Sequence, residues 1–200
     1  MTSANAAHQV VNSNSLIFGT TTDTGSTALY RGNRLIDRSD VPGVAGFTLP
    51  TANAQYRLVL DAARKLPGWL LSPHIHAEWT FRSGATNPTR RGALDLLSAH
   101  LDLPLDLHDR AVGSKPLRGD VLVDHQVGSA QIPVRSLDVK VSYGHGWHSA
   151  KVRAHGHGRF AITIPKPTRG ASYASLRITA RDWAGNTMTE TLDRAYGIMH

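Results

Sequence analysis

Histidines are the residues of this 200-residue sequence whose number and spacing most directly suggest chemistry. The sequence contains 11 of them, and two pairs are separated by a single residue, His74 with His76 and His155 with His157. On an extended strand, side chains two residues apart lie on the same face, so each pair could offer two imidazoles to one zinc or copper ion.

Two further histidines lie close to the second pair, which gives the candidate metal ligands His145, His148, His155 and His157. His145 and His148 would complete a site if the turn that carries them lies near His155. Glycines flank these residues, as in turns, and no Asp or Glu lies between His145 and His157 to orient the rings. Solvated loop histidines are therefore the favoured interpretation, and the sequence predicts no cofactor.

Catalytic signatures are weak. The string Asp23-Thr24-Gly25-Ser26 also occurs in aspartic proteases, where two carboxylates share a proton to activate water. Here it follows three threonines instead of an apolar strand and has no second copy, so a turn is favoured. There is no Gly-x-Ser-x-Gly elbow for a serine nucleophile, and the absence of cysteine excludes thiol catalysis and disulfides. We expect no catalytic residue, and we expect that the chain is not an enzyme.

The net charge of +7 is unevenly distributed. Residues 1–112 contain 10 basic and 9 acidic residues, or +1, whereas residues 113–200 contain 12 and 6, or +6. Such a basic half could attract an anionic polymer over long distances. Its Lys and Arg residues, however, occur singly at alternate strand positions without an aromatic ladder, which disfavours nucleic-acid binding.

Tryptophan side chains could form a platform that stacks on carbohydrate. Trp79 and Trp147 lie on the apolar phase of their strands, which predicts core packing for both. Trp183 lies at the tip of a turn and is the one expected to face solvent. Trp183 and Asn186, in the same turn, are therefore the candidate binding residues.

Short strands with one buried face account for the apolar pattern. Leu176, Ile178 and Ala180 alternate with polar residues, and turn residues 182–186 lead into a Thr-rich return strand, which predicts a hairpin. The same alternation recurs in residues 55–62, 76–83, 134–143 and 159–164. Strands at this spacing with Gly-rich turns predict an all-β chain of two tandem antiparallel β-sandwich units.

The expected organisation has four parts. A flexible N-terminal arm covers residues 1–14, a β-sandwich domain residues 15–112, a linker residues 113–119, and an immunoglobulin- or fibronectin-III-like β-sandwich residues 120–200. No apolar run approaches the roughly 18 residues of a membrane span, so we expect no membrane insertion. The first residues lack the basic and apolar regions of a secretory signal peptide.

Several segments together resemble a known family. They are Tyr30-Arg31-Gly32-Asn33-Arg34-Leu35-Ile36, Trp79-Thr80-Phe81-Arg82-Ser83, Ala180-Arg181-Asp182-Trp183-Ala184-Gly185-Asn186-Thr187 and Arg194-Ala195-Tyr196. In order and spacing they resemble the region C-terminal to the catalytic domain in bacterial secreted subtilisin-like serine peptidases. The resemblance implies non-catalytic β-sandwich domains and a secreted parent. The family's His-Gly-Thr and Gly-Thr-Ser-Met signatures are absent, so no catalytic residue carries over.

The resemblance predicts an accessory role, in which this region packs on a protease catalytic domain or presents loops to a cell-surface polymer. The alternative is a free-standing binding module for a glycan or an anionic polymer, which would use the basic half of the chain. The resemblance implies a secreted, extracellular protein.

Overall fold

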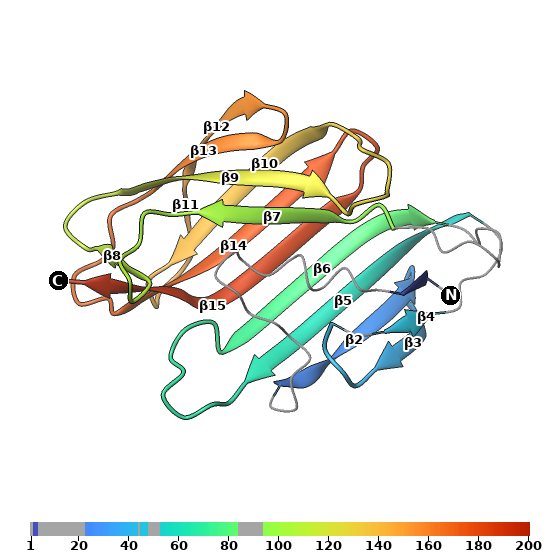
Figure 1. Ribbon diagram of the computed structural model, residues 1–200, viewed down its shortest axis with the longest axis horizontal. Helices are drawn as coiled ribbons and strands as arrows, with labels where there is room; N and C mark the ends of the chain where they lie inside the picture. Colours follow the sequence, from blue (N-terminus) through green and yellow to red (C-terminus); the bar gives the residue numbers. More distant parts are fainter. Residues whose placement is uncertain (1, 4–22, 44, 48–52, 84–93) are drawn as a thin grey trace.

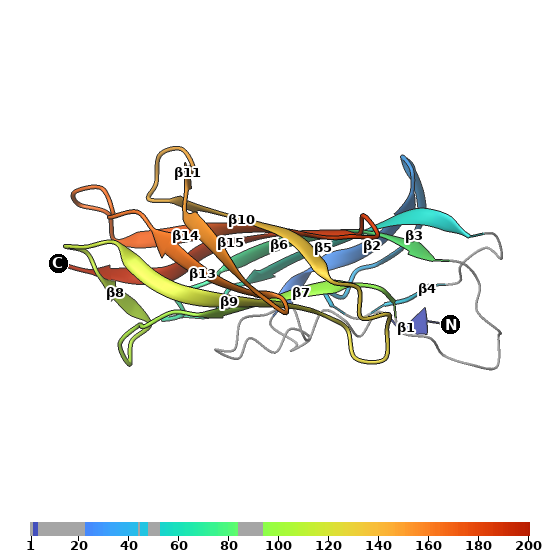
Figure 2. The same ribbon diagram turned by 90° about the horizontal axis from the view of Figure 1, so that it is seen from above.

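The computed structural model describes residues 2–3, 23–43, 45–47, 53–83 and 94–200. Over these residues the chain forms strands and no helix. A nine-stranded sheet and a four-stranded sheet lie one over the other (Figure 1, Figure 2). Neighbouring strands are antiparallel except where β8 joins β15. The predicted all-β sandwich class is confirmed.

The large sheet has a continuous path of strands, with one short strand beside it. In spatial order the path is β11 (His148–Ser149), β10 (Val134–Ser142), β14 (Tyr173–Asp182), β15 (Thr187–Met199), β6 (His74–Ser83), β5 (Ala54–Arg64), β2 (Asp23–Arg31) and β3 (Arg34–Ser39). β8 (Arg110–Val112) pairs in parallel with the end of β15.

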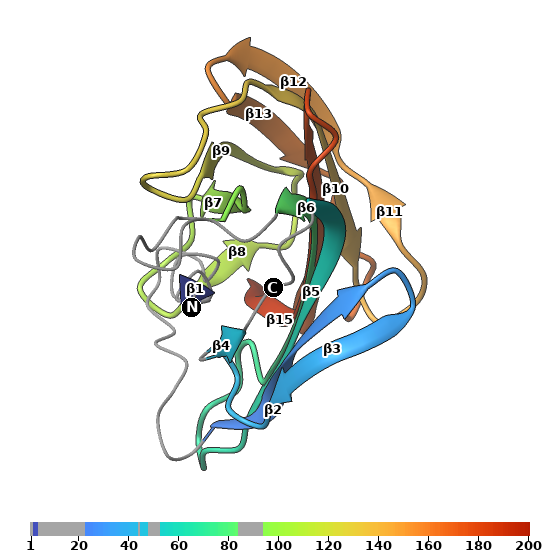
Figure 3. The same cartoon turned by 90° about the vertical axis from the view of Figure 1, so that its right-hand side faces the viewer.

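The small sheet consists of β12 (Lys151–Gly156), β13 (Arg159–Ile164), β9 (Leu117–His125) and β7 (Leu97–Asp102), in that order. It packs over the part of the large sheet that contains β10, β14 and β15, and β5, β2 and β3 extend beyond it (Figure 3). A separate pair, β1 (Thr2–Ser3) and β4 (Gly46–Phe47), completes the described strands.

The core lies between the two layers and follows the predicted alternation. Leu176, Ile178 and Ala180 are fully buried, while the residues between them form the outer face of the large sheet. Trp79 is also buried, as predicted, and its indole Nε1 donates a hydrogen bond of 2.9 Å to the Leu97 carbonyl. This bond connects β6 of the large sheet to β7 of the small one.

One sheet and one core run through both predicted units. β15, from the range 120–200, pairs with β6, from the range 15–112. Buried side chains of both ranges belong to the same hydrophobic cluster. The segment 113–119 therefore does not separate two sheets, and β9 already begins within it at Leu117. Of the predicted arm, only Thr2 and Ser3 are described; the rest lies outside the described residues.

Two local expectations were wrong. Trp147 is 36% exposed, because it lies at the β10–β11 turn, where the Arg177 guanidinium stacks 4.4 Å from its ring. Asp23 begins strand β2 instead of forming a turn, and its carboxylate makes a bidentate ion pair with Arg64 at 2.7 and 2.8 Å. Both side chains of that pair are buried. No helix in the described part of the chain is long and apolar enough to cross a membrane.

Candidate functional site

The four candidate metal ligands lie on two exposed turns. His145 and His148 belong to the β10–β11 hairpin, and His155 and His157 lie at the β12–β13 hairpin. The chain between the two pairs is extended and crosses from the large sheet to the small one. Across the described residues, no group of three or more His, Cys, Asp or Glu side chains is arranged to hold a metal ion. The expectation that these are solvated loop histidines stays a prediction.

The other histidine pair shares one carboxylate. Asp61 on β5 lies between the rings, with Oδ1 2.7 Å from His74 Nε2 and Oδ2 2.7 Å from His76 Nδ1. Burial raises the pKa of the Asp61 carboxyl, but the hydrogen bonds and charges of His76 and His74 outweigh this effect, so its pKa lies below the ordinary value. Because all three side chains are about two-fifths exposed, solvent screens the ion pairs.

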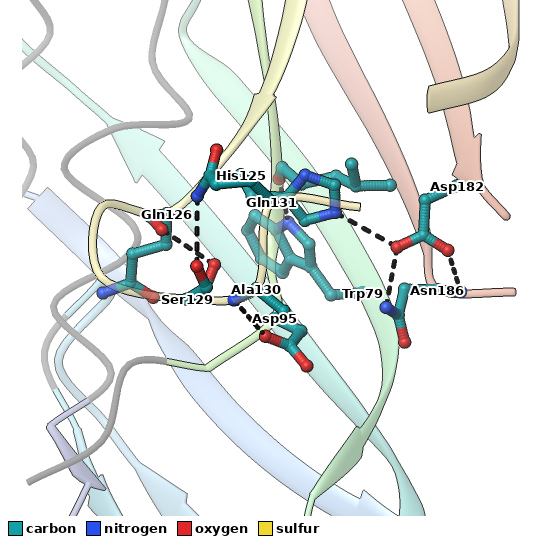
Figure 4. Close-up of polar contacts among 10 residues, drawn as sticks. Trp79, Asp95, His125, Gln126, Ser129, Ala130, Gln131, Asp182 and Asn186 are labelled. Atoms are coloured by element: carbon teal, nitrogen blue, oxygen red, sulfur yellow. Dashed lines mark hydrogen bonds and ion pairs between the residues drawn. The ribbon is translucent and has the colours of Figure 1, made fainter. Parts of the chain in front are cut away.

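A buried polar network holds the β14–β15 turn (Figure 4). Asp182 accepts hydrogen bonds from the backbone N–H of Asn186 at 2.9 Å and from the Asn186 side-chain amide at 2.7 Å. His125 Nε2, from β9 in the other sheet, lies 3.1 Å from Asp182 Oδ2. All three residues are buried, so the network joins the two layers. Asn186, a candidate binding residue, is thus placed inside the protein.

Trp183, in the same turn, is 66% exposed, in agreement with the sequence-based expectation. The Arg135 guanidinium stacks 5.0 Å from its ring. Arg135 also lines a pocket of about 580 Å³ between β9, β12 and β13, whose lining does not include Trp183. Trp183 can offer a ring to a partner.

A second candidate site lies at the opposite end of β14. A pocket of about 590 Å³ opens between the β5–β6 loop, β8, the start of β14 and the end of β15. These four segments gather at the left of Figure 1. The pocket walls are lined by Gly68, Trp69, Leu70, Leu71, His108, Asp109, Arg110, Ser172, Tyr173, Gly197 and Ile198.

Two aromatic rings, those of Trp69 and Tyr173, lie in the wall of this pocket. Trp69 is 43% exposed, and the Arg64 guanidinium lies 5.5 Å from its ring centre. The Tyr173 ring is stacked in the same manner by Arg194, at 5.6 Å. Each guanidinium lies over one face of its ring, a contact worth about 0.5–1 kcal/mol at an exposed site, which favours this orientation of the ring. Leu70, 55% exposed, adds apolar surface beside them.

The backbone around the pocket contains uncommon conformations. Ser72, Asp109 and Arg194 all have positive φ, at 44°, 55° and 47°. Two of them are bonded to each other, since the Ser72 N–H donates to the Arg194 carbonyl at 3.1 Å, and the Asp109 carbonyl accepts from the Gly197 N–H at 2.9 Å. Non-glycine residues in this region cost about 1–3 kcal/mol each and cluster at binding and catalytic sites. We therefore take this pocket, the aromatic pocket, as the candidate functional site.

Sequence reasoning missed the aromatic pocket because its walls come from four distant segments. One signal was available: Trp69 and Leu70 are large apolar residues in a loop bounded by Pro67-Gly68 and Pro73. Large apolar residues side by side in a loop are candidates for binding, because binding residues are often carried on loops. The parallel pairing of β8 with β15, which brings Arg110 next to Gly197, has no counterpart in the sequence pattern.

Comparison of the sequence with known protein families and with curated proteins finds no matching family model and no matching protein.

Proposed function

We propose that this protein is a non-catalytic binding module that holds a carbohydrate chain in the aromatic pocket. The observation that carries the proposal is the pair of rings, Trp69 and Tyr173, each with a guanidinium over one face, at the wall of one partly apolar cavity. Binding sites for small molecules and chain segments combine an apolar lining with a few polar groups that set orientation. Here the polar groups are those of His108, Asp109 and Arg110.

The chemistry of the lining favours a sugar over a purely apolar ligand. A pyranose ring has an apolar C–H face that can stack on an aromatic ring, and hydroxyl groups at its edge. Arg110 is held by two bonds of 2.9 Å from its guanidinium to Asp106, so its position is fixed before a ligand arrives. A site prepared in this manner loses less conformational entropy on binding.

The substitution Trp69→Ala tests the proposal. We expect it to weaken the binding of a hexasaccharide such as chitohexaose at least about 10-fold, the effect of truncating an aromatic anchor. Isothermal titration calorimetry measures the change. The matched control is Trp183→Ala, which removes the more exposed tryptophan from the opposite end of β14 and should leave the affinity unchanged. If the wild type and the Trp69→Ala variant bind with equal affinity, or if only the Trp183→Ala control loses affinity, the aromatic pocket is not the binding site.

A second proposal follows from the resemblance to the region behind the catalytic domain of secreted subtilisin-like peptidases. In that role the module would deliver a protease to its polymer, and the two proposals agree on the binding site. An immunoblot of cell and culture fractions with antibody against residues 113–200 separates them. A secreted band far above 21.7 kDa supports the protease parent, and a band at 21.7 kDa supports the free-standing module.

A further inference from the structure

A second pocket follows the aromatic pocket along the same two strands. Its volume is about 540 Å³, and its walls are Val112, Gly113, Ser114, Lys166, Pro167, Thr168, Arg169, Met199 and His200. We name it the basic pocket. It lies where the pairing of β8 with β15 ends. These strand ends are at the left of Figure 1.

The strand register makes the two pockets neighbours. Arg110 and Gly197 are paired and line the aromatic pocket. Two residues further along both strands, Val112 and Met199 are paired and line the basic pocket. Side chains two residues apart on a strand share a face and lie about 6–7 Å apart. Val112 and Met199 are 42% and 39% exposed, so exposed apolar side chains of the basic pocket lie two residues along the strands from Arg110 and Gly197.

The basic pocket contains two cations, Lys166 and Arg169, that form no ion pair among the described residues. Both residues are exposed. The lining includes the hydroxyl groups of Ser114 and Thr168 and no Asp or Glu side chain. His200 is already engaged, with Nε2 2.8 Å from the Ala171 carbonyl oxygen. Two such cations beside hydroxyl donors form a lining that complements an anionic group.

We propose that the two pockets form one groove for an acidic polysaccharide. This inference rests on the proposed function and specifies its ligand class. The sugar rings stack on Trp69 and Tyr173 in the aromatic pocket, and Lys166 and Arg169 bind a carboxylate or sulfate carried by a following sugar. The basic half of the chain supplies the long-range attraction, and these two residues supply the contact.

The experiment compares hexasaccharides of equal length by calorimetry: chitohexaose, which is neutral, a hyaluronan hexasaccharide, which carries carboxylates, and a heparin hexasaccharide, which also carries sulfates. The test variant is K166Q/R169Q. The matched control is K151Q/R153Q, which removes the same charge from exposed residues of β12 in the small sheet. All four positions lie outside the core, so both variants are expected to fold.

The wild type should bind an acidic hexasaccharide at least 10-fold more tightly than chitohexaose. K166Q/R169Q should lose that difference and retain the affinity for chitohexaose, and K151Q/R153Q should change each affinity less than 2-fold. The better acidic ligand identifies the group: hyaluronan a carboxylate, heparin a sulfate. Raising the salt concentration should weaken only the acidic ligands, because it screens the exposed cations.

Other outcomes separate this inference from the proposed function. If both double variants lose affinity equally, the attraction is general charge and the basic pocket is not a subsite. If K166Q/R169Q binds all ligands as the wild type does while Trp69→Ala loses them, the carbohydrate module stands and the acidic ligand class is wrong. If K166Q/R169Q loses the acidic ligand while Trp69→Ala does not, the basic pocket stands and the aromatic pocket is wrong. If the wild type binds none of the three, both are overturned.

Discussion

Replacing Glu190 by Gln should make the protein more stable at pH 8 and leave its stability almost unchanged at pH 4.5. Glu190 lies on the inner face of β15 between Met188 and Leu192 and is 1% exposed. Its Oε1 atom has no hydrogen-bond partner within the described structure. Burial raises the pKa of this carboxyl from 4.5 to about 8.

The direction of the pH dependence follows from proton linkage. Between pH 4.5 and 8 the folded state keeps a proton on Glu190 that the unfolded state releases, so the free energy of unfolding falls as the pH rises. At about 1.4 kcal/mol per pKa unit, the loss reaches at most about 5 kcal/mol at pH 8. Glutamine has the same shape without a titrating proton, so the variant lacks this loss.

Urea unfolding of the wild type and E190Q at pH 4.5, 6 and 8 measures the effect as the difference between the two free energies at each pH. E78Q is the control on the neighbouring strand: the Glu78 side chain is 39% exposed and pairs with Arg57 at 2.9 Å. The free energy of unfolding of E78Q should differ from that of the wild type by less than about 1 kcal/mol at each pH. If the free energies of unfolding of the wild type and E190Q differ by the same amount at pH 4.5, 6 and 8, Glu190 does not have a pKa raised by burial.

Removing the Asp182 carboxylate should cost about 3–5 kcal/mol of stability, because Asp182→Ala leaves buried donors of His125 and Asn186 without an acceptor. The carboxylate itself is fully buried and receives two hydrogen bonds from Asn186. Since the network joins the sheets, the thermal unfolding temperature should fall by several degrees or more.

The control for this substitution is Asp138→Ala on the outer face of β10. The Asp138 side chain is 54% exposed, and its carboxylate lies 3.9 Å from Lys140 Nζ, so its removal should cost less than about 1 kcal/mol. Unfolding curves measured by circular dichroism at pH 7 compare the variants. Similar losses for Asp138→Ala and Asp182→Ala would mean that the buried network contributes no more than a surface contact.

The strands and their buried faces could be predicted from the sequence, because the period of two is a local property. Val139 and Val141, like Leu58 and Leu60, are buried where the alternation places them. The partners of the strands could not be predicted. Periodicity identifies which side of β6 is apolar, but nothing local indicates that β6 pairs with β15 and not with a strand nearer in sequence.

The candidate site was predicted less well, for the same reason. Trp183 is exposed as expected, yet the cavity lies around Trp69, which is far from Tyr173 in the sequence. The alternation of apolar and polar residues predicted a buried Trp147, but this residue lies at a turn. There the guanidinium of Arg177, from β14, covers its ring. A pocket wall depends on which segments a fold brings together, and that information is in the pairing of strands.

The position of β15 has a consequence for how the chain folds. This last strand of the sequence lies inside the large sheet, between β14 and β6, and its Thr187 bonds to Thr80, which is 107 residues earlier. Closing so long a loop is entropically costly, so folding should be slow compared with that of proteins rich in local contacts. During synthesis, β6 keeps an open hydrogen-bonding edge until β15 leaves the ribosome, and over that time the nascent chain is exposed to aggregation.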